Sequence, residues 1–161
     1  MTDAPATDMQ VTPPAAAPGQ APSVATKKPV LGSNPYHWGT GRRKTAVARV
    51  RIKPGSGQFK VNDRDVDEFF KVGENQAAVR TPLNVTETLK SMDVFVNVHG
   101  GGIHGQADAV VLGLARALVK ANADYEPKLR ESNLLTRDSR KVERKKYGQS
   151  GARKRFQYSK R

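Results

Sequence analysis

The sequence predicts a small α+β domain in which helices pack on a mostly antiparallel sheet, followed by a long basic tail. Three short segments alternate apolar with polar residues and are separated by turn residues, which is typical of antiparallel strands. One longer segment, beginning at Ile103, repeats its apolar residues with helical spacing. The formal net charge of +13 is concentrated at one end, because residues 137–161 carry 11 Lys and Arg against 2 acids.

The first half of the domain is expected to contain a hairpin and two helices. Apolar residues occupy every second position of 46–52, Pro-Gly-Ser-Gly at 54–57 supplies a turn, and 58–61 alternate again. Asp65 and Glu68 have the spacing of a capping box, which predicts a short helix. Residues 74–80 are expected to be helical and to stop before Pro82, because a proline disfavours helical backbone in the preceding residue.

The second half is expected to contain one strand and the longest helix. Residues 92–99 alternate and predict the strand. A single apolar stripe predicts the helix, and it consists of Ile103, Ala107, Val110, Val111, Leu114 and Leu118. A shorter helix is expected to begin near Pro127, a residue favoured in the first turn. Another is expected to follow Asp138 as its cap and to end before Gly148.

Composition divides the chain into an extension (1–35), a globular domain (36–136) and a basic tail (137–161). Residues 1–35 contain seven Ala and seven Pro without hydrophobic periodicity, which predicts disorder, although a docking role stays open. The sequence contains no cysteine, so disulfides and thiolate metal sites are excluded. No apolar run has the length of a membrane span, and no secretory signal is recognised, so no membrane partner is expected.

The segment HGGGIHG, residues 99–105, places glycines between a predicted strand and a predicted helix. Its Gly-x-Gly-x-x-Gly spacing matches a dinucleotide fingerprint, but no second parallel strand is predicted after the helix. Its HGGG also matches an esterase oxyanion loop, but the chain lacks Gly-x-Ser-x-Gly. Two interpretations of the glycines remain: tight packing of the strand against the helix, and binding of a phosphate at the start of the helix. The surrounding charge favours phosphate, and the predicted contacts are Gly100, Gly101, Gly102, His104 and Gln106.

Two basic segments also predict a polyanionic partner. The first lies between Gly39 and Ile52 and has no acid, which fits nucleic-acid backbone contacts, with a solvated sheet face as the alternative; its bases are Arg42, Arg43, Lys44, Arg49 and Arg51. The second is the tail, whose crowded like charges destabilise an isolated helix and favour phosphate contacts. Its predicted contacts are Arg137, Arg140, Lys141, Arg144, Lys145, Lys146, Arg153, Lys154 and Arg155.

Four segments in order resemble the bacterial type of the small-subunit ribosomal protein S9 family: GTGRRKTAVARVRIKPGSG, VNVHGGGIHGQADAVVLGLARAL, LTRDSRKVERKKYG and QYSKR. The resemblance covers about residues 36–161. It implies a structural protein, not an enzyme and without a cofactor, in the cytoplasmic ribosome. The implied partners are small-subunit ribosomal RNA and neighbouring proteins of the subunit head. It also implies a left-handed strand–helix–strand crossover, where general rules favour the right-handed sense.

The resemblance further implies that the end of the tail reaches the transfer RNA in the peptidyl site. The residues that match the family's last positions are Tyr158, Ser159, Lys160 and Arg161. Phe156 departs from the family, which often has proline there. Two alternatives are a general nucleic-acid binder with a basic arm and a nucleotide-using enzyme. The first is disfavoured because no predicted helix suits a groove, and the second because no acid–base pair or nucleophile is recognised.

Overall fold

The computed structural model describes residues 35–160 and confirms an α+β fold with a mostly antiparallel sheet. The sheet has the order β1-β2-β5-β3-β4, and its strands are β1 (His37–Arg43), β2 (Ala46–Pro54), β3 (Phe59–Val61), β4 (Arg64–Asp65) and β5 (Met92–His99). Every pair is antiparallel except β3 with β5. The helices are α1 (Val66–Phe69), α2 (Gly73–Val85), α3 (Ile103–Ala121), the 3-10 turn η1 (Ala123–Tyr125) and α4 (Glu126–Glu131).

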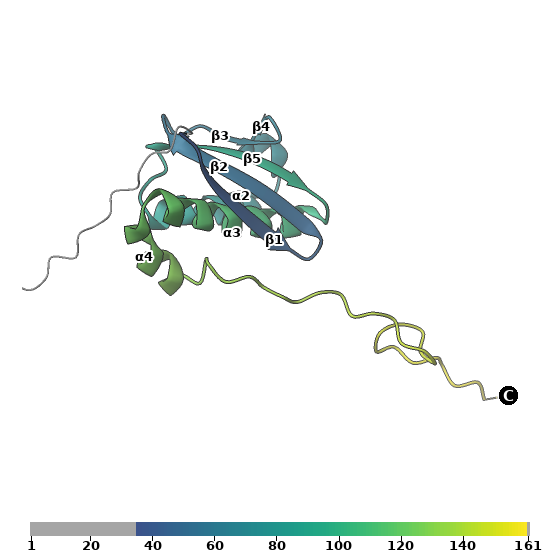
Figure 1. Ribbon diagram of the computed structural model, residues 1–161. Helices are drawn as coiled ribbons and strands as arrows, with labels where there is room; N and C mark the ends of the chain where they lie inside the picture. The colour runs from purple at the N-terminus through teal and green to yellow at the C-terminus, as the bar shows by residue number, and fades with distance from the viewer. Residues whose placement is uncertain (1–34, 161) are drawn as a thin grey trace, which may run out of the picture.

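One face of the sheet is covered by α2 and α3, and the other is left uncovered by helices (Figure 1). The predicted alternation in 46–52 is confirmed, because Ala46, Ala48, Val50 and Ile52 are all fully buried beneath the helices. Three valines of β5 complete the sheet side of the core, and the predicted stripe of α3 supplies the other side. The period-two and helical patterns therefore identified the two layers of the core, except that Ile103 is 53% exposed and Val111 is only partly buried.

Strand β1 was not predicted, because its inward positions are glycines, which are rare in strands. A Cβ atom on Gly39 would lie 2.1 Å from the carbonyl oxygen of Gly113, and one on Gly41 would lie 1.8 Å from that of Ala109. The backbone of β1 thus approaches the backbone of α3 too closely for any side chain. Arg116 of α3 also donates from Nη1 to the carbonyl oxygen of Thr40 at 2.8 Å.

The predicted hairpin between 46–52 and 58–61 is wrong, because β5 lies between β2 and β3 and pairs with both. The β3–β4 hairpin was missed, and its turn explains the side chain of Asn62. Asn62 and Asp63 have φ values of 48° and 64°, as a two-residue type I′ turn requires. The Asn62 amide donates to the carbonyl oxygen of Val98 at 3.0 Å and accepts from its amide nitrogen at 2.9 Å. This side chain extends the pairing of β3 with β5 past the end of the short strand.

Helix boundaries were predicted less well than helix positions. The helices near Glu68 and Pro127 are confirmed as α1 and α4. The predicted stop before Pro82 is wrong, because α2 continues to Val85 with Pro82 buried inside it. The helix predicted after Asp138 is also wrong, since residues 137–146 carry neither helix nor strand. Its crowded Lys and Arg residues repel one another at helical spacing, and no apolar face packs against the domain to offset this repulsion.

The turn between β2 and β3 depends on the buried carboxylate of Asp93. Its Oδ1 accepts hydrogen bonds from the amides of Ser56, Gly57 and Gln58 at 2.8, 3.1 and 3.0 Å, and Lys53 Nζ lies 3.8 Å from Oδ2. The pKa of Asp93 lies below 3.8, chiefly because of the Gln58 amide. A lowered pKa means that this stabilisation is complete above pH 3.8 and is lost as the pH falls through the folded-state value.

We expect Asp93→Asn to lower the free energy of unfolding at pH 7 by about 1–2 kcal/mol, because hydrogen bonds to a charged acceptor become neutral ones. Urea denaturation of both proteins at pH 7 and pH 3 measures this loss. Other carboxyl groups titrate in both proteins, so their effects cancel in the difference. The difference should shrink at pH 3. An equal difference at both pH values would contradict the assigned role of the carboxylate.

Candidate nucleic-acid interface

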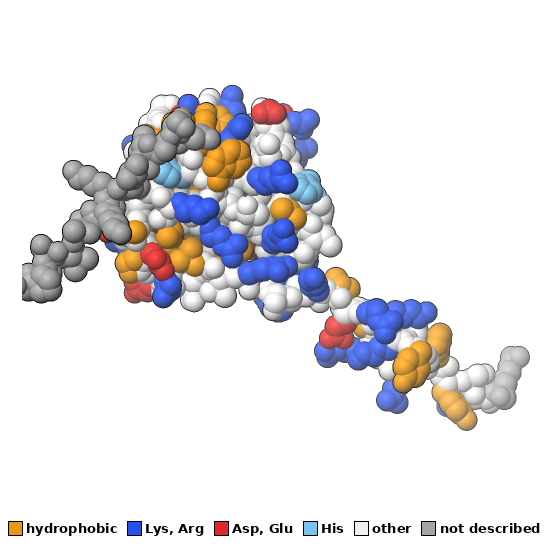
Figure 2. Space-filling view, in the orientation of Figure 1, with side chains coloured by type: hydrophobic (Ala, Val, Ile, Leu, Met, Phe, Trp, Pro, Cys, Tyr) orange, Lys and Arg blue, Asp and Glu red, His pale blue; other side chains and the backbone are white. Residues whose placement is uncertain are grey.

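Exposed bases lie on the uncovered face of the sheet. Arg49 and Arg51 occupy alternate positions of β2 and share this face, as predicted, and Arg42 lies on it in the neighbouring strand β1. Arg42 and Arg49 are exposed, whereas Arg51 is half-buried. Figure 2 shows Lys and Arg side chains spread over the side of the domain turned to the viewer and continuing along the tail.

Aromatic rings hold part of this basic face in place. The Arg51 guanidinium lies 5.5 Å from the ring centroid of Phe95 and 5.8 Å from that of Tyr36. Lys53 Nζ lies 5.6 and 6.0 Å from the same two centroids. These distances are typical of cation–π contacts. Lys53 was not among the predicted contacts, although its period-two spacing from Arg49 and Arg51 places it on the same face.

The glycine loop between β5 and α3 combines close packing with one open position. Gly100 and Gly101 have φ values of 76° and 65°, and a Cβ atom on Gly100 would lie 2.6 Å from the Thr45 carbonyl oxygen. Gln106 does not extend freely, because its Nε2 donates to the carbonyl oxygen of Gly100 at 3.0 Å. Gly102 has no atom within 4 Å of an added Cβ. The packing interpretation therefore fits Gly100 and Gly101, and Gly102 leaves space where an anion can approach the start of α3.

The side chain of His104 contacts the protein. Its Nδ1 lies 2.9 Å from Oδ1 of Asn75, a buried residue of α2. Within residues 35–160 no group of three His, Cys, Asp or Glu side chains could hold a metal ion. His104 therefore links α3 to α2 from an exposed position beside the loop.

A cavity of about 500 Å³ joins the glycine loop to the two basic segments. Its walls come from the turn between β1 and β2, the glycine loop and the start of the tail. Lys44 and Lys141 both line it, although nearly a hundred residues separate them in the sequence. Folding thus places predicted contacts from the glycine loop and both basic segments around one hollow, with Gly102 in its wall.

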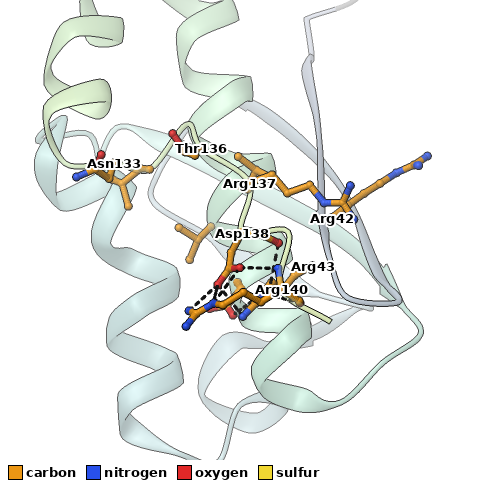
Figure 3. A pocket seen from close by; sticks show the side chains of 11 residues that line it. Arg42, Arg43, Asn133, Thr136, Arg137, Asp138 and Arg140 are labelled. Carbon is orange, nitrogen blue, oxygen red and sulfur yellow. Dashed lines mark hydrogen bonds and ion pairs between the residues drawn. The ribbon is translucent and has the colours of Figure 1, made fainter. Parts of the chain in front are cut away.

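Arg43 anchors the tail to the domain. Its side chain is only 12% exposed, and Nη1 donates to the carbonyl oxygens of Asp138 and Arg140 at 3.4 and 2.9 Å. Nη2 lies 2.8 Å from Oδ2 of Asp138, and Nε lies 3.2 Å from Oδ2 of Asp108 on α3. Figure 3 shows these side chains together in a pocket of about 290 Å³, with Arg42 pointing away from them. The guanidinium of Arg43, predicted from the sequence to contact RNA, is thus bonded within the protein.

The carboxylate of Asp138 completes this anchor. Its Oδ2 accepts from Nε and Nη2 of Arg140 at 2.9 and 2.7 Å, and its Oδ1 accepts from the Arg140 amide at 2.8 Å. These bonds, with the charge of Arg43, lower the pKa of Asp138 to about 2. The group is therefore ionised, and the anchor intact, throughout the neutral range.

We expect Arg43→Gln to free the root of the tail, because a glutamine cannot reproduce the bonds to both backbone carbonyls and both carboxylates. Limited trypsin digestion followed by mass spectrometry should show cleavage after Arg137 and Arg140 accelerated severalfold. Arg42→Gln is the matched control, since it removes an exposed charge from the adjacent position. Unchanged cleavage in Arg43→Gln, or equal acceleration in both variants, would contradict the anchor.

Beyond the anchor the tail is extended and exposed, with one closed loop (Figure 1). Arg153 Nε lies 3.0 Å from Oε2 of Glu143, which lowers the pKa of that carboxyl, and Ser150 donates its amide to the Lys154 carbonyl at 2.9 Å. The remaining bases of the tail are exposed: Arg137, Arg140, Lys141, Arg144, Lys145, Lys146, Lys154 and Arg155. Tyr158, Ser159 and Lys160 are exposed at the far end, and Arg161 lies outside the described residues.

The predicted extension, residues 1–35, is described only at Pro35, so its predicted disorder lies outside the described residues. No helix within residues 35–160 has the length and apolarity needed to cross a bilayer.

Comparison with known proteins identifies the family. The family model described as ribosomal protein S9/S16 matches residues 41–161. The small ribosomal subunit protein uS9 of Treponema pallidum is 59% identical over 123 residues, which cover 76% of this chain and 95% of the relative. The uS9 protein of Anaeromyxobacter sp. strain K is 51% identical over 121 residues, 75% of this chain and 93% of the relative. The chain therefore belongs to the ribosomal protein S9/S16 family.

Proposed function

We propose that the protein is a structural component of the small subunit of the cytoplasmic ribosome and binds ribosomal RNA in the subunit head. One observation carries this proposal. The chain belongs to the S9/S16 family, and its exposed Lys and Arg side chains extend from the open sheet face, past the glycine loop, along the tail. The relatives are themselves named as small-subunit proteins. Because the family consists of ribosomal structural proteins, the alternative of a nucleotide-using enzyme is rejected.

The arrangement suits RNA because each part offers a different contact. Arg42 and Arg49 present charges on a broad sheet face, as phosphate positioning requires. Gly102 leaves the first turn of α3 accessible to a phosphate oxygen. The exposed bases of the tail neutralise phosphates and release counterions, which supplies most of the affinity at low salt. Neighbouring proteins of the head are the remaining proposed partners.

The tail gives the protein reach. Residues 148–161 span at most about 45–50 Å when fully extended, and the Arg43 anchor sets the direction in which the tail leaves the domain. We assign its last residues, 158–161, to the transfer RNA in the peptidyl site. The left-handed crossover stays a prediction for the connection from β3 to its parallel neighbour β5, which runs through β4, α1 and α2.

Cosedimentation tests the proposal against a general nucleic-acid binder. A tagged protein expressed in cells should migrate with small subunits through a sucrose gradient in high salt, because its contacts are buried in assembled RNA and not merely electrostatic. A binder with a basic arm should dissociate and remain near the top of the gradient. Migration with DNA, or release from subunits at moderate salt, would contradict the assignment.

A further inference from the structure

A row of alternating aromatic and basic side chains crosses four strands on the uncovered sheet face. Trp38 of β1 lies opposite Arg51 of β2, Arg51 lies opposite Phe95 of β5, and Phe95 lies opposite Lys60 of β3. Directly opposite residues point to the same face, where their side chains are close enough to interact. The row is therefore continuous from the outer edge of the sheet into its centre.

Trp38 is the exposed aromatic of this row. It is 46% exposed, whereas Phe95 is half-buried, with Arg51 and Lys53 within cation–π distance of it. A single exposed aromatic is ordinary on a protein surface, so exposure alone assigns nothing. The residues around Trp38 are more informative. The next two positions of β1 on this face are Thr40 and Arg42, and Arg49 lies opposite Thr40. Each step along the strand is roughly 7 Å, so the charges follow the ring at regular spacing.

The charges of this face favour a polyanion over a protein partner. Its bases are Arg42, Arg49, Arg51, Lys53 and Lys60. Of the acids, Asp93 is buried and bonded to three turn amides, and Asp65 is exposed on the edge strand β4, directly opposite Lys60. Protein interfaces are depleted of charge at their centre, whereas single-stranded nucleic acid is bound by aromatic rings set among cations.

We propose that Trp38 stacks on an unpaired base of RNA while Arg49 and Arg42 bind the adjoining phosphates. The inference rests on the proposed function, since that function supplies RNA as the partner. The base must be unpaired, because the faces of paired bases are covered by their neighbours in a duplex and cannot reach a ring on a sheet. Ribosomal RNA bound here would therefore present a loop, a bulge or a junction strand.

The sequence contains a single tryptophan, so its fluorescence reports on this site alone. A ten-nucleotide oligouridylate should quench Trp38 in the full-length protein, and an RNA hairpin with the same number of phosphates and a short loop should quench it less. Oligouridylate bound to the tail alone does not stack on the indole of Trp38. The measurements are therefore made at elevated salt, which weakens the phosphate contacts of the tail. Saturating oligouridylate without quenching would overturn the proposal. Quenching by purified proteins of the subunit head, but not by RNA, would assign the face to a protein and also overturn it.

Variants separate stacking from charge. Trp38→Leu should weaken oligouridylate binding about 5- to 150-fold by anisotropy of a labelled oligomer and leave the salt slope unchanged, whereas Trp38→Phe should retain most of the affinity. Arg49→Gln should reduce the salt slope by about one phosphate contact. Unaltered circular dichroism and thermal midpoint establish folding. Equal affinities of Trp38→Leu and the wild type would refute the site. Failure of cosedimentation would instead refute the proposed function and leave the fluorescence result standing.

Discussion

Replacing Gly41 with alanine should lower the free energy of unfolding by about 3 kcal/mol or more, which is a large share of the stability of a small domain. The added Cβ would lie 1.8 Å from the carbonyl oxygen of Ala109 and 2.5 Å from the amide nitrogen of Gly113, and both atoms belong to the backbone of α3. A side chain could move aside, but here a strand or a helix must shift. Urea denaturation followed by circular dichroism measures the loss.

Gly73→Ala is the matched control for Gly41→Ala. Gly73 begins α2, and an added Cβ there meets no atom within 4 Å. We expect this variant to be neutral or more stable by up to about 1 kcal/mol, because alanine restricts the unfolded chain. The contrast separates the close approach of β1 and α3 from the general effect of removing a glycine. Equal stability of the two variants would show that β1 does not pack on α3 at this distance.

Removing residues 158–161 should leave folding intact and lower the affinity of small subunits for transfer RNA in the peptidyl site. Folding should be spared because the described residues of this segment, Tyr158, Ser159 and Lys160, are exposed and join no core. Assembly should be largely spared because nine Lys and Arg remain between Arg137 and Arg155. The truncation removes one stacking ring, worth about 1–3 kcal/mol, and two cations. Filter binding and dissociation rates on purified subunits measure the defect.

The salt response distinguishes the two contributions of the tail end. Lys160→Ala combined with Arg161→Ala should reduce the salt slope of transfer RNA binding by up to about two phosphate contacts. Tyr158→Ala should weaken binding without changing the slope, because stacking releases no counterions. Many other contacts hold the transfer RNA, so we expect faster dissociation rather than complete loss. Truncated subunits that assemble normally and retain transfer RNA equally well at every salt concentration would contradict the assignment of residues 158–161.

The residues predicted to bind RNA divide into two groups in the structure. Arg49, Arg42 and most bases of the tail are exposed, as local sequence pattern and charge indicated. Arg43, Gln106 and His104 bond within the protein, to the tail root, to the glycine loop and to Asn75 of α2. Residue type could not separate the groups, because a guanidinium or an amide offers the same donors to a phosphate and to a carbonyl. Only the position of the partner, 95 or 97 residues away for Arg43, decides between them.

The sequence by itself determined the charge distribution, the family, strand β2, strand β5 and helix α3. These elements can be predicted because the apolar residues of each repeat with the period of its secondary structure and one face is buried. The local pattern and the tertiary packing therefore agree. It also predicted the glycine loop in its correct place between β5 and α3.

The tertiary structure alone decided β1, the continuation of α2 through Pro82 and the path of the tail. Gly39 and Gly41 have no strand propensity of their own, and they form a strand because β2 supplies the hydrogen bonds and α3 approaches the backbone. Pro82 stays helical because it and Leu83 are buried, which offsets the hydrogen bond that proline cannot make. The tail root is held by Arg43 from another element. In each case the deciding free energy comes from residues distant in sequence, which no local pattern contains.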